Sequence, residues 1–213
     1  MKKLLLAVFS ITTTFSLYAQ REVPQERMEQ IYEEVKTPYK YGLAIAPADN
    51  HHKVDCPTVF RQGDKWLMTY VVYNGKSGMD GRGYETWIAE SDNLLEWRTL
   101  GRILSYRDGK WDCNQRGGFP ALPDMEWGGS YELQTYKGRH WMTYIGGEGT
   151  GYEAVKAPLY IGLASTKGDI STAHEWESLD KPILSIHDKD AQWWEKLTQY
   201  KSTVYWDKDK ILG

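Results

Sequence analysis

The 213-residue sequence contains only two cysteines, Cys56 and Cys113, and no long apolar run after its first residues. No second Cys or His stands at metal-ligand spacing from either cysteine, which argues against a zinc site. The pair can form one disulfide in an oxidising compartment or remain as two buried thiols, and the sequence leaves both open. Without a later apolar segment of about 20 residues, we predict no membrane-spanning helix.

An excess of basic residues is also lacking, with 26 Lys and Arg against 29 Asp and Glu and a formal net charge of -3. This balance argues against nucleic acid or an anionic membrane as a partner. Several catalytic motifs are missing as well: the sequence has no G-x-S-x-G, no phosphate-binding glycine loop and no H-E-x-x-H. We therefore predict none of these chemistries and no cofactor.

The N-terminus, MKKLLLAVFSITTTFSLYAQ, places two lysines before a short apolar run that ends in LYA. This is the pattern of a secretory signal peptide, which we assign to residues 1–19. We expect an exported protein, periplasmic or extracellular. Residues 20–50 form a lead-in with a short amphipathic helix. Its apolar face comprises Met28, Ile31, Tyr32 and Val35.

Aromatic and turn residues, in contrast, are abundant: the sequence has 10 Trp, 15 Tyr and 20 Gly. This composition suits β-structure and sugar binding by stacking on ring faces, although most of the rings should lie in the core. From Asp55 onward two apolar-rich runs are joined by the turn residues QGDK. A third run then ends in AES and a fourth begins near Trp97. Four strands in succession predict an antiparallel meander.

The same order recurs downstream. Met68 and Met142 are 74 residues apart (142 minus 68), and so are Ser91 and Ser165 (165 minus 91). Two copies of a four-strand unit are the sequence signature of propeller blades. The predicted propeller domain spans 51–213, with blade one at 51–105, blade two at 106–185 and the start of a third blade at 186–213.

A propeller closes with about four to eight blades. Because this sequence supplies two and the start of a third, we predict that it is the N-terminal portion of a longer protein. That protein should be a monomer when complete.

Four features together resemble the five-bladed β-propeller glycosidases, a superfamily that includes glycoside hydrolase families 43, 32, 117 and 130. They are the aspartate of the first strand, the GD hairpin, the aromatic second strand and the A-x-S-D-x-x-x-x-W ending of blade one. The resemblance runs from Asp55 to the end of the sequence. It implies an all-β five-bladed propeller, a carbohydrate substrate and catalysis by carboxylates at the starts of the innermost strands. It also leaves room for a calcium ion in the propeller channel.

Within this resemblance Asp55, in VDCP, takes the place of the blade-one catalytic aspartate, although a cysteine here precedes the proline. An acid at the mouth of a strand that should be buried costs free energy unless a function requires it. An offset of 74 from Asp55 reaches Gly129, and the nearest acid on the expected strand is Glu132. We predict Asp55 and Glu132 as catalytic carboxylates. The alternative is that Glu132 is an ordinary strand acid or a ligand contact.

Substrate-binding residues are predicted in two places. The Gly-rich loop KWDCNQRGGFPALPD carries polar side chains that can bond sugar hydroxyls and a tryptophan that can stack on a sugar ring. The other place is the start of blade three, where the general acid of families 43 and 32 has no trusted counterpart: Glu195 is the nearest glutamate, and the acid can lie beyond residue 213. The predicted residues are Trp111, Asp112, Gln115, Arg116 and Lys201. The alternative for the loop is a structural role with a surface arginine.

The predicted function is a secreted glycoside hydrolase that cleaves oligo- or polysaccharides with carboxylate acid/base catalysis. One alternative is a phosphorylase that resembles family 130, which needs basic residues near the carboxylate, and Arg116 and Lys201 are the candidates. Another is a carbohydrate-binding propeller without catalysis. The 213 residues alone can also be inactive, because an open ring exposes a blade edge.

Overall fold

The computed structural model describes residues 23–36, 42–47, 52–75, 81–152 and 158–207. The chain divides into two units, residues 1–40 and 41–213. In the first unit the predicted helix is present as α1 (Gln25–Val35), and the Lys36 N–H closes its last turn on the Tyr32 carbonyl at 2.9 Å. The packing of its apolar face stays a prediction, and the predicted signal peptide lies outside the described residues. None of the described helices is long and apolar enough to cross a membrane.

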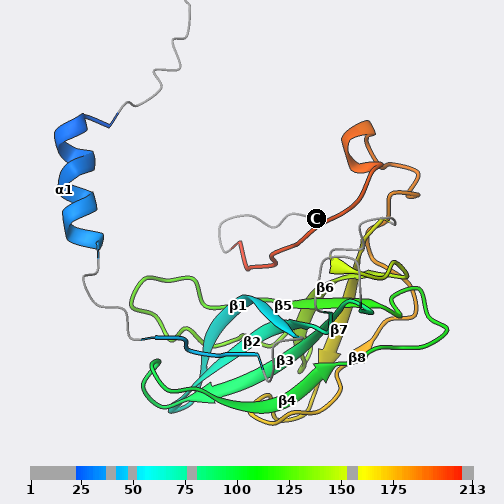
Figure 1. The fold of residues 1–213 in the computed structure, drawn as a ribbon, viewed down its shortest axis with the longest axis horizontal. Coiled ribbons are helices and arrows are strands. Elements are labelled where there is room, and N and C mark those ends of the chain that lie inside the picture. Colours follow the sequence, from blue (N-terminus) through cyan, green and yellow to red (C-terminus); the bar gives the residue numbers. More distant parts are fainter. Residues whose placement is uncertain (1–22, 37–41, 48–51, 76–80, 153–157, 208–213) are drawn as a thin grey trace, which may run out of the picture. The chain divides into compact units, whose positions relative to one another are not determined.

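The second unit consists of two four-stranded antiparallel sheets, each a meander in chain order (Figure 1). The first sheet contains β1 (Lys53–Gln62), β2 (Lys65–Tyr73), β3 (Tyr84–Ser91) and β4 (Arg98–Leu104). The second contains β5 (Gln115–Pro120), β6 (His140–Gly147), β7 (Tyr160–Thr166) and β8 (Glu177–Ser178). The all-β fold and the two blade-like sheets expected from the sequence are confirmed.

The register of the strands preserves the repeat. Met68 pairs with Ala89 across β2 and β3, and Met142 pairs with Ala164 across β6 and β7. The second strands are therefore offset by 74 residues, as predicted. The third strands are offset by 75 (164 minus 89), one more than the spacing of the two serines suggested.

Blade two departs from the prediction at its first strand. β5 lies inside the segment expected to be an approach loop, whereas Glu132 lies in the connection between β5 and β6, residues 121–139. The corresponding connection in blade one, between β1 and β2, is the turn Gly63-Asp64. A constant offset of 74 fails here because the extra residues of blade two follow its first strand.

The register also identifies the blade-two counterpart of Asp55. Val71 faces Asp55, and Ile145, which is equivalent to Val71, faces Gly117. Gly117 rather than Gly129 therefore occupies the position of Asp55, and the first strand of blade two has no carboxylate there.

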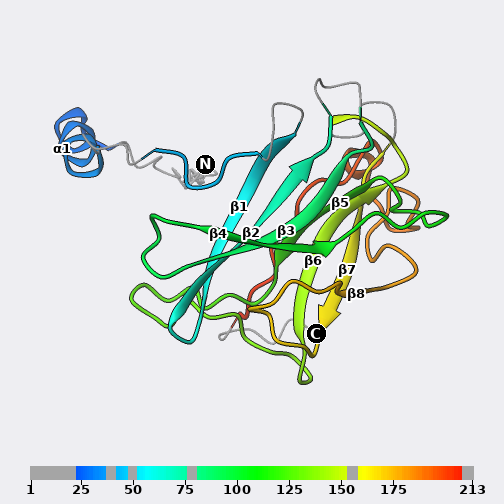
Figure 2. The ribbon, with the colours of Figure 1, turned by 60° about the horizontal axis from the view of Figure 1, so that its bottom comes forward.

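The two sheets pack against each other through β5, which lies against β2 and β3 (Figure 2). Thr86 on β3 joins them, since its hydroxyl donates to the Arg116 carbonyl at 2.7 Å and accepts the Gly118 N–H at 2.7 Å. Blade two is tightly packed internally: a Cβ added at Gly162 would lie 2.2 Å from Cζ of Tyr144. The buried cluster that both sheets share comprises Phe60, Leu67, Ile88, Ile103, Leu104, Leu133, Met142, Tyr144, Ala164, Ile170 and Trp176.

The segment expected to begin a third blade has a different local structure. Its described part, up to residue 207, contains the short 3-10 helix η2 (Trp193–Glu195) and no strand. The chain beyond η2 runs alongside blade two, where the Leu122 N–H donates to the Val204 carbonyl at 2.7 Å. The predicted strand is thus not formed, but the segment does reach the first strand of blade two.

Candidate active site

Asp55 lies near the start of β1, at an irregularity in the pairing with β2 between Asp55 and Thr58. Cys56, inside this irregularity, has a left-handed backbone with φ of 52°. Its N–H donates to Oδ1 of Asp55 at 2.6 Å. The Asp55 residue itself is exposed, so the expected cost of burying an acid does not arise. The bulge aims an exposed carboxylate away from the regular ladder, as bulges beside functional sites do.

A tyrosine of blade two completes the environment of this carboxylate. Tyr152, five residues after the end of β6, donates its hydroxyl to Oδ2 of Asp55 at 3.2 Å. Its ring contacts Tyr73 and Tyr84 edge to face, with centroids 5.4 and 5.6 Å away. The Lys53 ammonium lies 5.6 Å from the same ring centroid. The site is therefore built by both blades.

Lys201 is brought to the same place by the segment after η2. Its ammonium lies 5.7 Å from the ring centroid of Phe119 on β5 and hydrogen-bonds the Cys56 thiol. Of the predicted substrate-binding residues, Lys201 is thus placed beside the residue that follows Asp55. It is exposed, as a substrate-binding lysine must be.

A cavity of about 250 Å³ adjoins Asp55. Its walls come from β1, β2 and the chain before β1. The lining residues are Ala44, Ile45, Val54, Asp55, Pro57, Met68 and Tyr70. A mostly apolar hollow with an ionisable group at its wall is a common form of binding site.

Glu132 does not approach Asp55. Its carboxylate accepts the Gly63 N–H at 3.0 Å, in the turn that follows β1. Eight residues of strand separate Gly63 from Asp55, a distance on the order of 25 Å. Paired glycosidase carboxylates lie at most about 9.5 Å apart. The predicted pairing of Asp55 with Glu132 is therefore wrong.

Asp112 and Arg116, predicted to bind sugar, are fully buried instead. Asp112 accepts both Nε and Nη2 of Arg107, with its shortest contacts at 2.9 Å, and the Tyr144 hydroxyl at 2.8 Å. Nε of Arg116 lies 3.3 Å from Oδ2 of Asp112. Burial, together with the Asp112 carboxylate, raises the pKa of the Tyr144 phenol, so it remains a donor. The predicted sugar contact of both residues is wrong, because neither presents a surface.

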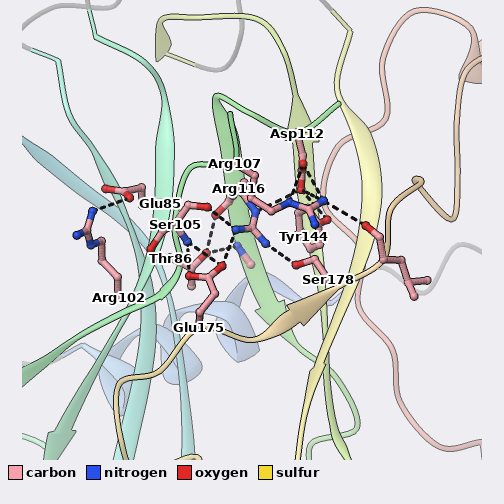
Figure 3. Close-up of polar contacts among 12 residues, drawn as sticks. Glu85, Thr86, Arg102, Ser105, Arg107, Asp112, Arg116, Tyr144, Glu175 and Ser178 are labelled. Atoms are coloured by element: carbon pink, nitrogen blue, oxygen red, sulfur yellow. Dashed lines mark hydrogen bonds and ion pairs between the residues drawn. The ribbon is translucent and has the colours of Figure 1, made fainter. Parts of the chain in front are cut away.

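The other end of Arg116 joins further parts of blade two (Figure 3). Its guanidinium donates to Glu175 at 2.7 Å, to the Ser105 carbonyl and to the Ser178 hydroxyl. The Glu175 carboxylate in turn accepts the Ser105 N–H at 2.9 Å. Arg116 thus ties β5 to β8 and to the chain that links the blades, which is the structural alternative left open by the sequence.

Gln115 is also fully buried, so its predicted sugar contact is wrong as well. Its amide donates to the carbonyls of Gly149 and Gly151 at 2.9 and 2.8 Å, and its oxygen accepts the Tyr84 N–H at 3.3 Å. These bonds hold the chain that leads to Tyr152. Gln115 therefore supports the site from beneath.

Trp111 is half-buried and stacks on Tyr144, with ring centroids 5.9 Å apart and planes at 18°. It also lines a second cavity, of about 300 Å³, together with Glu148, Tyr160 and His187. No contact places it at Asp55 within the described residues, but its accessible part keeps the predicted sugar stacking as a proposal.

Sequence reasoning missed Tyr152, because it follows a glycine-rich segment and belongs to no periodic pattern. Only the approach of one blade to the next brings it to Asp55. In the part of the chain that the structure describes, no group of three or more His, Cys, Asp or Glu is arranged to hold a metal ion.

The two cysteines are free thiols, and each is half-buried. Burial is the main cause that raises the pKa of both thiols, although Lys201 opposes it at Cys56. We expect both to react with Ellman's reagent more slowly than an unperturbed thiol at mildly alkaline pH, and faster as the pH rises, because the thiolate is the nucleophile. Two thiols per molecule should titrate after unfolding in guanidinium chloride without reductant. A count of zero would show a disulfide instead.

Comparison with known proteins gives a strong likeness to solved structures. One described as "Glycoside hydrolase" is 94% identical, with a TM-score of 0.82, over 88% of this chain and 53% of that one. A second, a complex of BT0996 with RGII, has the same identity, TM-score and coverage. The chain thus spans about half the length of these relatives, and the resemblance to glycoside hydrolases is confirmed.

A third structure, Zg3597, is a family 117 glycoside hydrolase from Zobellia galactanivorans. It is 11% identical, with a TM-score of 0.45, over 64% of this chain and 40% of that one, a likeness that carries no argument. No protein-family model matches the sequence, and no curated protein matches it.

Proposed function

We propose that these residues form the N-terminal part of a glycoside hydrolase propeller that cleaves oligo- or polysaccharides. The 94% identity to a solved glycoside hydrolase over 88% of this chain is the observation that carries the proposal. Because the chain spans 53% of that relative, the proposal concerns the protein as completed by the corresponding remainder. Export, expected from the N-terminal residues, is part of the same proposal.

Asp55 is proposed as one catalytic carboxylate. It is exposed, lies at a cavity and has both oxygens oriented by hydrogen bonds. Such a group can take a proton from an attacking water or attack the anomeric carbon itself, while a second carboxyl protonates the leaving oxygen. A separation of roughly 6.5–9.5 Å would indicate inversion of configuration, and one of about 5 Å retention. The second carboxyl is proposed to come from another strand of the funnel, since Glu132 is too far away.

The substrate class is proposed from the second similar structure, in which BT0996 is in complex with RGII. Phosphorolysis is less favoured than hydrolysis. Of the two basic residues expected to face a phosphate, Arg116 is fully buried and ion-paired, whereas Lys201 is exposed.

The test uses a chimera in which the 213 residues are continued by the remaining part of the 94% identical glycoside hydrolase. The 213-residue protein is assayed beside it. RGII and a panel of aryl glycosides are incubated with each protein, with and without inorganic phosphate, and released reducing ends and sugar phosphates are quantified. Binding is measured in parallel by calorimetry.

We expect the chimera to release reducing ends in phosphate-free buffer. Sugar phosphates that appear only with phosphate would replace hydrolysis by phosphorolysis. Binding without any turnover would contradict the enzyme proposal and identify a carbohydrate-binding propeller.

A further inference from the structure

The contact between Tyr152 and Asp55 joins the two blades at the candidate active site. We infer that Tyr152 is a positioning residue that fixes the orientation of the Asp55 carboxylate, an inference that rests on the proposed function. Its hydroxyl donates to Oδ2 at 3.2 Å, while Oδ1 accepts the Cys56 N–H at 2.6 Å. One oxygen is held by its own strand and the other by the neighbouring blade. Rotation of the carboxylate about its Cβ–Cγ bond would break both hydrogen bonds.

The chain that carries Tyr152 is itself held from both blades. Buried Gln115 donates to the carbonyls of Gly149 and Gly151, and the Gly151 N–H donates to the Gly81 carbonyl at 3.1 Å. The backbone of Gly151, with φ of 88°, is in the left-handed region that favours glycine. The residue immediately before Tyr152 is therefore fixed by hydrogen bonds to both sheets.

The ring of Tyr152 is held independently of its hydroxyl. It meets Tyr73 at 88° and Tyr84 at 65°, and Lys53 lies against it. A phenylalanine can keep these ring contacts, so Tyr152→Phe removes the hydrogen bond to Asp55 and retains the packing. This separation makes the role testable.

A positioned carboxylate has its free lone pairs aimed at one place, which is the condition for efficient proton transfer or nucleophilic attack. Tyr152 contributes by orientation and gives up no proton in the reaction. Losing it should therefore lower kcat and leave ground-state sugar binding largely intact.

The experiment measures kcat and KM of the chimera for its best substrate in four forms: parent, Tyr152→Phe, Asp55→Asn and the double variant. We expect Tyr152→Phe to lower kcat roughly 10- to 100-fold with KM changed less than about threefold, the size expected for one hydrogen bond to a charged group. In the Asp55→Asn background the same change should have little further effect, since the group that Tyr152 orients is gone.

Tyr106→Phe is the matched control. Its hydroxyl donates to the Gly83 carbonyl at 2.7 Å, so the variant also loses one tyrosine hydrogen bond, but none to Asp55. It should keep the parent kcat. A Tyr152→Phe variant with parent kcat, or one whose loss is undiminished in the Asp55→Asn background, would overturn the inference.

Crystal structures of the parent and of Tyr152→Phe provide a readout that needs no turnover. If no form hydrolyses any substrate, the proposed function fails, and the inference is still decided by these structures. An Asp55 carboxylate that is rotated or spread over several rotamers in Tyr152→Phe supports positioning. A carboxylate that keeps its place and order contradicts it.

Discussion

Replacing Asp55 with asparagine in the chimera should lower kcat by about 10²- to 10⁴-fold and leave sugar affinity nearly unchanged. Asparagine has almost the same shape, and its carbonyl oxygen can still accept a hydrogen bond, either from Cys56 N–H or from Tyr152. It carries no charge, however, and can neither accept a proton at neutral pH nor attack an anomeric carbon effectively. The loss should therefore appear in turnover, measured as released reducing ends, and not in binding, measured by calorimetry.

Asp64→Asn is the matched control for this prediction. Asp64 is an exposed aspartate in the turn at the opposite end of β1, so the variant makes the same chemical change on the same hairpin. We expect parent turnover from it. If Asp55→Asn also kept parent turnover, Asp55 would be a sugar-binding or structural residue and the catalytic assignment would have to move to another carboxylate.

The strand pattern of this fold could be predicted because its signals are local. The alternation of apolar runs with short turns located all four strands of blade one, and the repeated MTY located the second strand of blade two. The first strand of blade two has the sequence QRGGFP, which is polar and glycine-rich. It is a strand because Gly117 and Gly118 fit closely against the side chains of neighbouring strands, where a Cβ would lie 3.1 and 2.3 Å from the nearest atom. Such a close approach leaves no periodic signal in the sequence.

The candidate site could be predicted only in part. The position of Asp55 followed from a motif, and Lys201 was placed near it by the resemblance. The error at Glu132 arose from carrying a fixed spacing through a connection of different length. The error at Asp112 and Arg116 has another cause: charged residues on a glycine-rich segment are usually exposed, and their burial depends on Arg107, Tyr144 and Glu175, which only the tertiary structure brings together.

The buried network around Asp112 leads to the second large expected effect. Asp112→Asn should lower the free energy of unfolding by about 3–5 kcal/mol, the usual cost of breaking a buried ion pair by removing one partner. Arg116 is fully buried and Arg107 mostly so, and the neutral amide would place N–H groups against donors that now meet a carboxylate. Because whole domains are stable by roughly 5–15 kcal/mol, the loss is a large share of the total. Urea unfolding followed by tryptophan fluorescence measures it.

Asp180→Asn is the control for this change, because Asp180 forms an ion pair with Lys110 at 3.1 Å in which both side chains are about half or more exposed. Solvent screens such a pair, so the unfolding midpoint should stay close to that of the parent. The double variant Asp112→Asn/Arg116→Met then separates charge from packing. If an uncompensated buried cation causes the loss, removing Arg116 from the Asp112→Asn protein should cost less than removing it from the parent. Equal costs in both backgrounds would mean that Arg116 stabilises the blade by filling space and bonding Ser105 and Ser178, with Asp112 contributing separately.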